Sequence, residues 1–157
     1  MRARVFAMFL GGVFACSAVL AANSAERVYI APPAPTTGGP AAPVSYGVLV
    51  GATLYIAGHV GLEEATERVP TDVDQEVHLA LDAVKQTLSR AGLSMNDLVS
   101  VTVYCTDVSL YDRFNKVYRT YFDDKYPSRA FIGVSQLAHG VHFEVAGVAV
   151  VPAKTAR

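Results

Sequence analysis

One arginine near the carboxyl end of the chain has the type and the surroundings to bind an anion. Arg129 opens a predicted strand, residues 128–134, whose following residues are mostly apolar. Its guanidinium therefore has no easy route to bulk water, and its planar fork suits a carboxylate or a phosphate held by two hydrogen bonds. The alternative is a structural ion pair with Asp123, Asp124 or another acid, and spacing alone leaves both interpretations open.

Glu144 is the second candidate, because it is the only acid in the apolar predicted strand 141–151. A carboxylate in the wall of a sheet loses hydration unless a charged or hydrogen-bonding group compensates it. Burial or a nearby arginine would shift its pKa, and either environment would suit a group that acts on water as a general acid or base. Two other interpretations stay open: Glu144 pairs with Arg129, or it faces solvent.

The remaining reactive side chains give weaker signals. His139 and His142 lie three residues apart, but a metal site needs three or four converging ligands, and no further ligand follows at suitable spacing. We therefore expect no metal. His59, at the end of a predicted strand, is expected to line a cavity, and Cys105 is interpreted as a buried apolar side chain rather than a nucleophile. The nucleophile-elbow, P-loop and dinucleotide-binding motifs are absent from the sequence.

The first 25 residues have the pattern of a secretory signal peptide. Arg2 and Arg4 precede an uncharged apolar run, and small residues follow, with cleavage expected near Ala21 or Ala25. The mature protein is then expected in the periplasm or outside the cell, without a membrane association. An uncleaved anchor and a lipid at Cys16 are the weaker alternatives.

Removal of the first 25 of the 157 residues leaves 132, and their composition limits the kinds of fold and of partner that we expect. Loss of two arginines leaves 11 basic against 14 acidic residues, a net charge of −3, and no basic run is present. Nucleic acid is therefore not an expected partner. A single cysteine cannot form an internal disulfide, so the core or an assembly must stabilise the fold.

The first half of the mature chain reads as strands followed by a helix. A short strand is expected at 26–30 and a Pro/Gly-rich arm to residue 43, followed by a domain over 44–157. Strands at 47–50 and 54–57 flank a turn and form a hairpin, and Gly58 is expected to end the second strand. Thr71 is the expected N-cap of a helix, and Gly92 its left-handed C-cap. The apolar side chains of this helix recur at helical spacing: Val77, Leu81, Val84, Leu88 and Ala91.

The second half supplies three more strands and a second helix. Residues 99–105 alternate, with Val99, Val101, Val103 and Cys105 expected on the core face. A helix is expected at 110–122, and strands at 128–134 and 141–151. The order predicts an α+β fold: a mixed sheet with two helices on one face. The other face would carry Tyr55, Tyr104 and several valines, and we expect another subunit to cover it.

Several segments together resemble the RidA/YjgF family over residues 28–151. The matching segments are Ser45-Tyr46-Gly47-Val48 leading to Leu54-Tyr55-Ile56-Ala57-Gly58, Ala91-Gly92-Leu93, Val101 to Asp107, Asn115 with Tyr121-Phe122, Tyr126-Pro127-Ser128-Arg129, and Val141 to Val145. The resemblance implies a chorismate-mutase-like fold and a homotrimer. Its three sheets would form a central barrel, with active sites between subunits.

The resemblance also implies an activity and the residues for it. The family reaction is hydrolysis of 2-imino acids, or their enamine forms, to 2-oxo acids and ammonia, without a cofactor. Arg129 would hold the substrate carboxylate, and Glu144 would position the attacking water. The backbone of Gly58 would line the pocket with His59 beside it, and Asn115 would shape the site.

Three positions depart from the family pattern. Val44 replaces a tyrosine, Ala57 replaces a serine before the pocket glycine, and Phe131 replaces a cysteine two residues after the arginine. We expect all three to line a pocket that is more apolar than usual. The expected function is a deaminase that hydrolyses C=N bonds. The alternatives are a trimer that binds a small acid without turnover and a holdase that works through exposed apolar surface.

Overall fold

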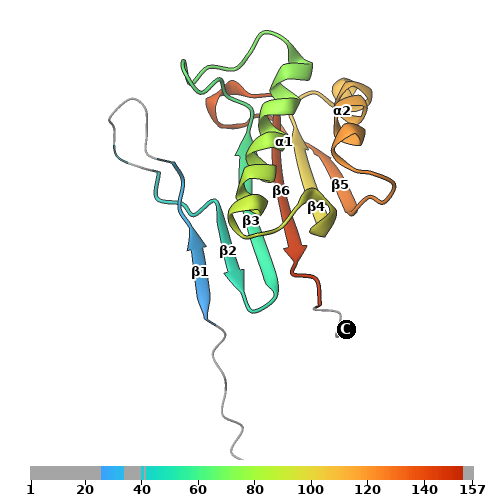
Figure 1. Cartoon of the computed structure of the whole chain (residues 1–157). Helices are drawn as coiled ribbons and strands as arrows, with labels where there is room; N and C mark the ends of the chain where they lie inside the picture. The colour runs from blue at the N-terminus through green and yellow to red at the C-terminus, as the bar shows by residue number, and fades with distance from the viewer. Residues whose placement is uncertain (1–25, 34–39, 41, 154–157) are drawn as a thin grey trace, which may run out of the picture.

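The computed structural model describes residues 26–33, 40 and 42–153, and these form a sheet covered on one side by helices (Figure 1). The predicted signal peptide and part of the predicted arm lie outside the described residues. No helix within the described ranges is long and apolar enough to cross a membrane.

The sheet has six strands in the order β1-β2-β3-β6-β4-β5. β4 and β5 run parallel, and the other neighbouring strands are antiparallel, so the predicted mixed sheet and α+β class are confirmed. The strands span Arg27–Ile30 (β1), Gly47–Val50 (β2), Thr53–Val60 (β3), Leu98–Cys105 (β4), Ser128–Gly133 (β5) and Phe143–Val150 (β6).

Helix α1, Val73–Arg90, runs along the strands on one face of the sheet (Figure 1) and buries the predicted apolar stripe. Its N-cap is Asp72, whose side chain accepts from the Asp74 amide, and not Thr71 as predicted. Aspartate competes well for this position because its short carboxylate also favours the positive end of the helix dipole. Gly92 has a φ of +73° after the last turn, which confirms the left-handed C-cap.

The predicted second helix is shorter than 110–122. Helix α2 covers Tyr111–Tyr118, and 3₁₀ turns flank it at Val108–Leu110 and Arg119–Tyr121. The apolar spacing that suggested one long helix is also compatible with these tighter turns, which are common at helix ends. Arg113 of α2 pairs with Asp72 and Asp74, so both helices lie together on one face of the sheet.

Two strands differ in detail from the prediction. β3 does not end at Gly58 but continues to Val60, with a register irregularity between Ile56 and His59. The pairing of β4 with β6 shifts between Leu98 and Ser100. Because this shift moves the alternation by one residue, Leu98 faces the core and Val99 is 48% exposed.

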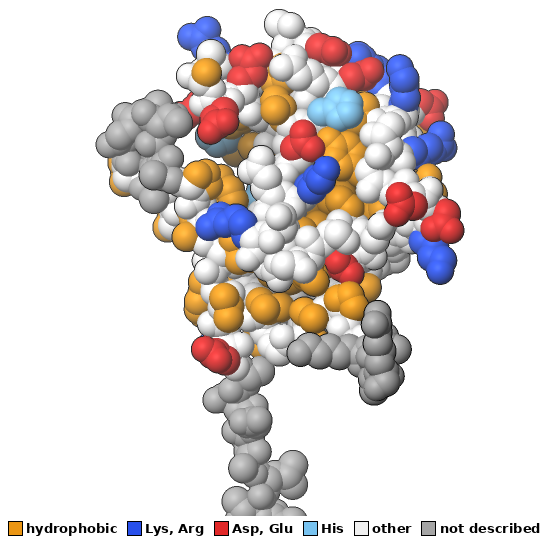
Figure 2. Space-filling view, viewed as in Figure 1, with side chains coloured by type: hydrophobic (Ala, Val, Ile, Leu, Met, Phe, Trp, Pro, Cys, Tyr) orange, Lys and Arg blue, Asp and Glu red, His pale blue; other side chains and the backbone are white. Residues whose placement is uncertain are grey.

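The two faces of the sheet differ sharply. The core lies between the sheet and α1 and includes Phe114 and Phe143, both fully buried. On the outer side of the helices, acidic and basic side chains are interspersed (Figure 2). The face without helices carries exposed Tyr29, Tyr55 and Ile132, with Val48 and Val148 half-buried beside them. This apolar face is large enough to require explanation.

Candidate anion-binding site

Arg129 lies on β5, on the face of the sheet that carries the helices. Its register partner is Val101, a core residue, so the guanidinium points toward α2. There it donates to the amide oxygen Oδ1 of Asn115 at 2.7 Å. Asn115 is buried, and this hydrogen bond fixes the orientation of the guanidinium without neutralising its charge.

Aromatic rings surround the guanidinium. Its central carbon lies 4.5 Å from the ring centroid of Tyr118, 5.8 Å from those of Tyr111 and Phe114, and 6.0 Å from that of Phe131. Ring faces attract a cation and limit its hydration. The rings therefore hold a charged group in place while leaving its charge available to an anion.

A pocket of about 330 Å³ opens beside this arginine. Its lining contains two cationic side chains, three tyrosines and no acid: Tyr111, Asn115, Tyr118, Arg119, Tyr126, Pro127 and Arg129. The ion pairs among the described residues do not include Arg129, and Asp123 instead accepts from Asn96. The structural ion pair considered from the sequence is thus not formed with these acids, and the site suits a small anion.

Tyr118 contributes an unusual group to the pocket wall. Its side chain is 3% exposed, and its hydroxyl is the one buried side-chain polar atom of the described residues without a hydrogen-bond partner. Burial raises the pKa of Tyr118 to about 12, so the hydroxyl keeps its proton. An unpartnered buried hydroxyl on a residue that lines a pocket is a feature that calls for an explanation.

Glu144 lies on β6 and extends over Gly58 of the neighbouring strand. A Cβ atom on Gly58 would overlap a carboxylate oxygen of Glu144, so the present position of the Glu144 side chain depends on the absence of a side chain at residue 58. Ala57 precedes Gly58 at the irregular step of β3 and is half-buried. The structure thus brings together Gly58, Ala57 and Glu144, as expected from the sequence.

The same structure separates Glu144 from Arg129. On β6 the neighbours of Glu144, Phe143 and Val145, are buried against the helices, so Glu144 points to the opposite face. Its register partner Tyr104 is on that face too. Arg129, Asn115 and Phe131 are on the helix side. One chain therefore does not bring the two predicted catalytic residues to a single ligand, and the pair of Glu144 with Arg129 left open from the sequence is not formed within one chain.

Two further predicted pocket residues join neither group. His59 is 4% exposed, its ring bonds Thr87 at 3.0 Å, and it meets the ring of Tyr46 edge-on. Burial lowers the pKa of His59 to about 4, so it is neutral and belongs to the core under α1. Val44 precedes β2 and is 46% exposed.

A buried carboxylate that sequence reasoning missed joins α1 to β6. Glu76 is fully buried and accepts from the backbone amides of His142 and Phe143 and from the His142 ring. This contact accounts for His142, one of the two histidines considered as metal ligands. Among the described residues, no three His, Cys, Asp or Glu side chains lie close enough to hold a metal ion.

Cys105 is buried, without a disulfide partner, and burial raises the pKa of its thiol, as the apolar interpretation predicted.

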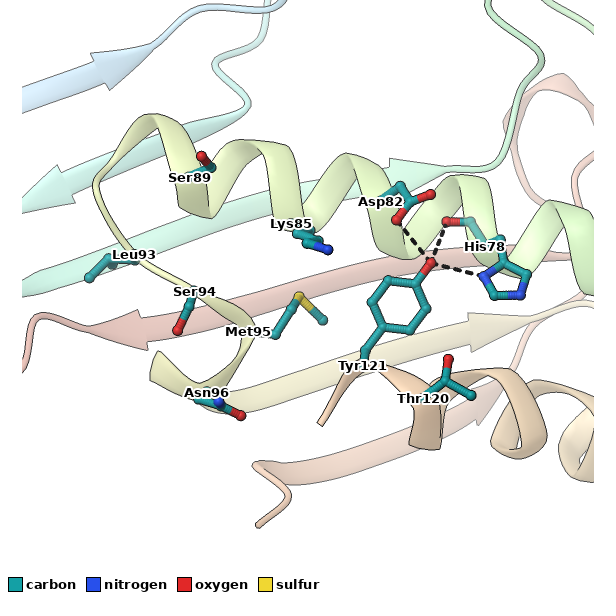
Figure 3. A pocket seen from close by; sticks show the side chains of 10 residues that line it. All are labelled: His78, Asp82, Lys85, Ser89, Leu93, Ser94, Met95, Asn96, Thr120 and Tyr121. Atoms are coloured by element: carbon teal, nitrogen blue, oxygen red, sulfur yellow. Dashed lines mark hydrogen bonds between the residues drawn. The ribbon is translucent and has the colours of Figure 1, made fainter. Parts of the chain in front are cut away.

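A second, wider pocket lies on the outer surface between α1 and the 3₁₀ turns, with a volume of about 610 Å³ (Figure 3). Its most ordered part is the hydroxyl of Tyr121, which bonds the His78 ring, the His78 carbonyl and Asp82. These polar groups satisfy one another. This pocket therefore offers a ligand fewer unpaired polar groups than the Arg129 pocket does.

The sequence predicts Arg129 and Asn115 as site residues but not the tyrosines and Arg119 that line the same pocket. Phe131, also predicted, lies 6.0 Å from the guanidinium carbon of Arg129 but is not among the lining residues. One signal was available: Tyr118 follows Asn115 by three residues and so shares its side of a helix. The contributions of Tyr126 and Arg119 depend on the path of the chain between α2 and β5, which periodicity does not define.

Comparisons with known proteins agree on one family. Residues 35–151 match the model of the family described as Endoribonuclease L-PSP. The mouse 2-iminobutanoate/2-iminopropanoate deaminase is 37% identical over 118 residues, which cover 73% of this chain and 87% of the mouse protein. A RutC family protein of Sulfurisphaera tokodaii is 34% identical over 108 residues, 68% of this chain and 86% of that protein. The solved structure of Escherichia coli TdcF with bound serine is 32% identical, with a TM-score of 0.68 over 73% of this chain and 92% of TdcF. The chain therefore belongs to the RidA/YjgF family, whose named members include reactive intermediate deaminases.

Proposed function

We propose that this protein hydrolyses small reactive 2-imino acids, or their enamine forms, to 2-oxo acids and ammonia. The observation that carries this proposal is the state of Arg129: a neutral amide orients it, rings enclose it, and no described acid neutralises it beside an open pocket. The names of the related deaminases support the reaction class.

The proposed chemistry needs little from the protein beyond positioning. Arg129 holds the substrate carboxylate, which places the electrophilic imine carbon at a fixed point. Glu144 accepts a hydrogen bond from one water and directs its oxygen to that carbon. The C–O bond forms as the C=N π electrons move to nitrogen, which takes a proton. Loss of ammonia from the resulting carbinolamine leaves the 2-oxo acid, and no cofactor is consumed.

Because Arg129 and Glu144 point to opposite faces of one sheet, we place the complete site between copies of the chain. The Arg129 pocket of one copy would meet the Gly58–Glu144 surface of the next. The apolar face with exposed Tyr29, Tyr55 and Ile132 supports this arrangement, since an assembly would remove it from water. In a closed homotrimer, the assembly expected from the family resemblance, each of the three copies would contribute the same two surfaces to its neighbours.

A trimer that binds small acids without turnover is the second candidate function. Phe131 favours it, because its ring stands 5.0 Å from that of Tyr111 and contributes an apolar side chain where the family pattern has cysteine. Ala57 likewise offers no hydroxyl next to Gly58. In either case we propose that the mature protein acts in the periplasm or outside the cell.

The test is a competition for a short-lived imine. An amino-acid oxidase generates 2-imino acids, semicarbazide traps them, and the protein is added. We expect wild type to suppress trapping, Arg129→Ala to abolish the suppression, and Glu144→Gln to lower it at least about 100-fold, the usual contribution of a general base. Lys116→Ala removes an exposed cation of α2 outside the pocket and serves as the control. Suppression that survives Arg129→Ala contradicts the mechanism, and binding of 2-oxobutanoate without suppression favours the binding protein.

A further inference from the structure

We propose that the Arg129 pocket selects ligands with two acidic groups, and that Arg119 binds the second one. This inference rests on the proposed function, because it assumes that Arg129 holds the first carboxylate. It assigns a substrate class to the pocket: imines and oxo acids of the dicarboxylate type, such as those derived from acidic amino acids.

The first argument is the charge of the pocket. Two of its seven lining residues, Arg119 and Arg129, are guanidinium groups, and the other lining residues are neutral. A monocarboxylate on Arg129 would leave one positive charge uncompensated in the same small space. A dianion neutralises both, and each guanidinium can bind a carboxylate through two parallel hydrogen bonds.

The second argument is that Arg119 has no other duty in the described part of the chain. Arg113, on the preceding helix α2, pairs with Asp72 at 3.0 Å and with Asp74 at 2.8 Å. Arg119 forms no ion pair or side-chain hydrogen bond with any described residue, and its side chain is exposed at the end of α2. The backbone of Arg119 places this residue at the pocket, and its guanidinium, unpaired among the described residues, is available to a ligand.

The third argument is the shape of the pocket. A volume of about 330 Å³ is at the lower end of the range for small-molecule sites, so it suits a short dicarboxylate. Tyr111 and Tyr126, both exposed, form part of the walls and leave the pocket open toward solvent. The first carboxylate then lies deeper, on Arg129, and the second acid group lies near the mouth, where the exposed Arg119 is.

The experiment compares two ligands that differ by one charge. Succinate and its monoamide, succinamate, have nearly the same size, and calorimetry measures both against the full-length protein, with 2-oxobutanoate as the monocarboxylate reference. We expect wild type to bind succinate about fivefold more tightly than succinamate, the size of effect that a partly exposed ion pair produces. Arg119→Ala should bring the two dissociation constants within about twofold of each other and weaken the binding of 2-oxobutanoate less than the binding of succinate. Lys116→Ala, which removes an exposed cation outside the pocket, should keep the preference for succinate.

The outcomes separate the two proposals. Equal binding of succinate and succinamate, with 2-oxobutanoate still bound in an Arg129-dependent way, overturns the dianion inference and leaves the proposed function in place. A preference for succinate that persists in Arg119→Ala also overturns it. So does a loss of binding of all three ligands in Arg119→Ala that is accompanied by a changed oligomeric mass. If none of the three ligands binds to wild type, and Arg129→Ala leaves the suppression of imine trapping unchanged, the proposed function itself fails.

Discussion

Tyr118 ends α2 and Tyr121 ends the 3₁₀ turn that follows, yet their hydroxyl groups are in opposite situations. The Tyr121 hydroxyl bonds Asp82 at 2.9 Å and the His78 ring at 3.0 Å. The Tyr118 hydroxyl is buried and has no hydrogen-bond partner in the described part of the chain. A buried polar group without a hydrogen bond costs free energy, and proteins retain such a group mainly where function uses it. The pair therefore allows a controlled test of the pocket at the level of single atoms.

Tyr118→Phe should stabilise the ligand-free protein, because it removes an unsatisfied hydroxyl and keeps the ring under the guanidinium of Arg129. We expect a gain of about 1 kcal/mol in the free energy of unfolding and a rise in Tm of roughly 3 °C. Tyr121→Phe should have the opposite sign, since it breaks existing hydrogen bonds. Thermal unfolding of both variants checks this, and destabilisation by Tyr118→Phe would show that its hydroxyl already has a partner.

Between elements, two buried polar contacts hold α1 on the sheet. Glu76 accepts from two backbone amides at the start of β6, and His59 of β3 bonds Thr87 of α1. Each polar group is compensated by its partner, which is the condition for burying it. Their positions set the height of α1 over the sheet. Of the two, His59 gives the fold a measurable dependence on pH.

Stability should fall as the pH drops from about 6.5 toward 4. In the unfolded chain His59 takes up a proton near its ordinary pKa, whereas burial lowers the pKa in the folded state to about 4. Over this window the unfolded state binds more protons, and the contribution amounts to about 3 kcal/mol. His59→Gln cannot titrate and should flatten this part of the profile. Urea unfolding at a series of pH values measures it, and an unchanged slope in His59→Gln would contradict the assignment.

Individual elements were more predictable from the sequence than their junctions. The stripe of α1 and the hairpin of β2 and β3 follow from short-range periodicity and turn residues, and the structure confirms both. The irregular steps near Gly58 and Leu98 do not, because a register shift depends on the neighbouring strand. The shift at Leu98 exchanged the predicted core position of Val99 for an exposed one.

For the site, the sequence identified individual residues but not their relation. Arg129 and Glu144 were found because each is a charged group in an apolar strand. The face that each side chain occupies is set by the register of β5, β4 and β6. Arg129 pairs with Val101, which pairs with Gly147, and Glu144 pairs with Tyr104. Pairing at that distance leaves no local trace in the sequence. The family resemblance implies sites between subunits. Because Arg129 and Glu144 point to opposite faces of one sheet, the proposed mechanism now requires such sites.

At the scale of the whole molecule, that requirement predicts complementation between two inactive variants. Arg129→Ala retains a good Glu144, and Glu144→Gln retains a good Arg129, so each lacks one half of every site. If the halves come from different copies, coexpression of the two variants in equal amounts should restore activity. In a randomly mixed trimer population, about three quarters of the trimers are mixed and one of their three sites is intact, which gives roughly a quarter of wild-type activity.

The same imine-trapping assay measures this complementation, and separately purified variants that are mixed without subunit exchange provide the control. If both residues of a site come from one copy, after a rearrangement that the described fold does not suggest, coexpression restores nothing. A double variant, Arg129→Ala with Glu144→Gln, coexpressed with wild type tells dilution from complementation, because it can contribute to no intact site. Recovery near a quarter with the single variants, together with about a quarter rather than half of the wild-type activity when the double variant is mixed equally with wild type, would locate the reaction between neighbouring copies.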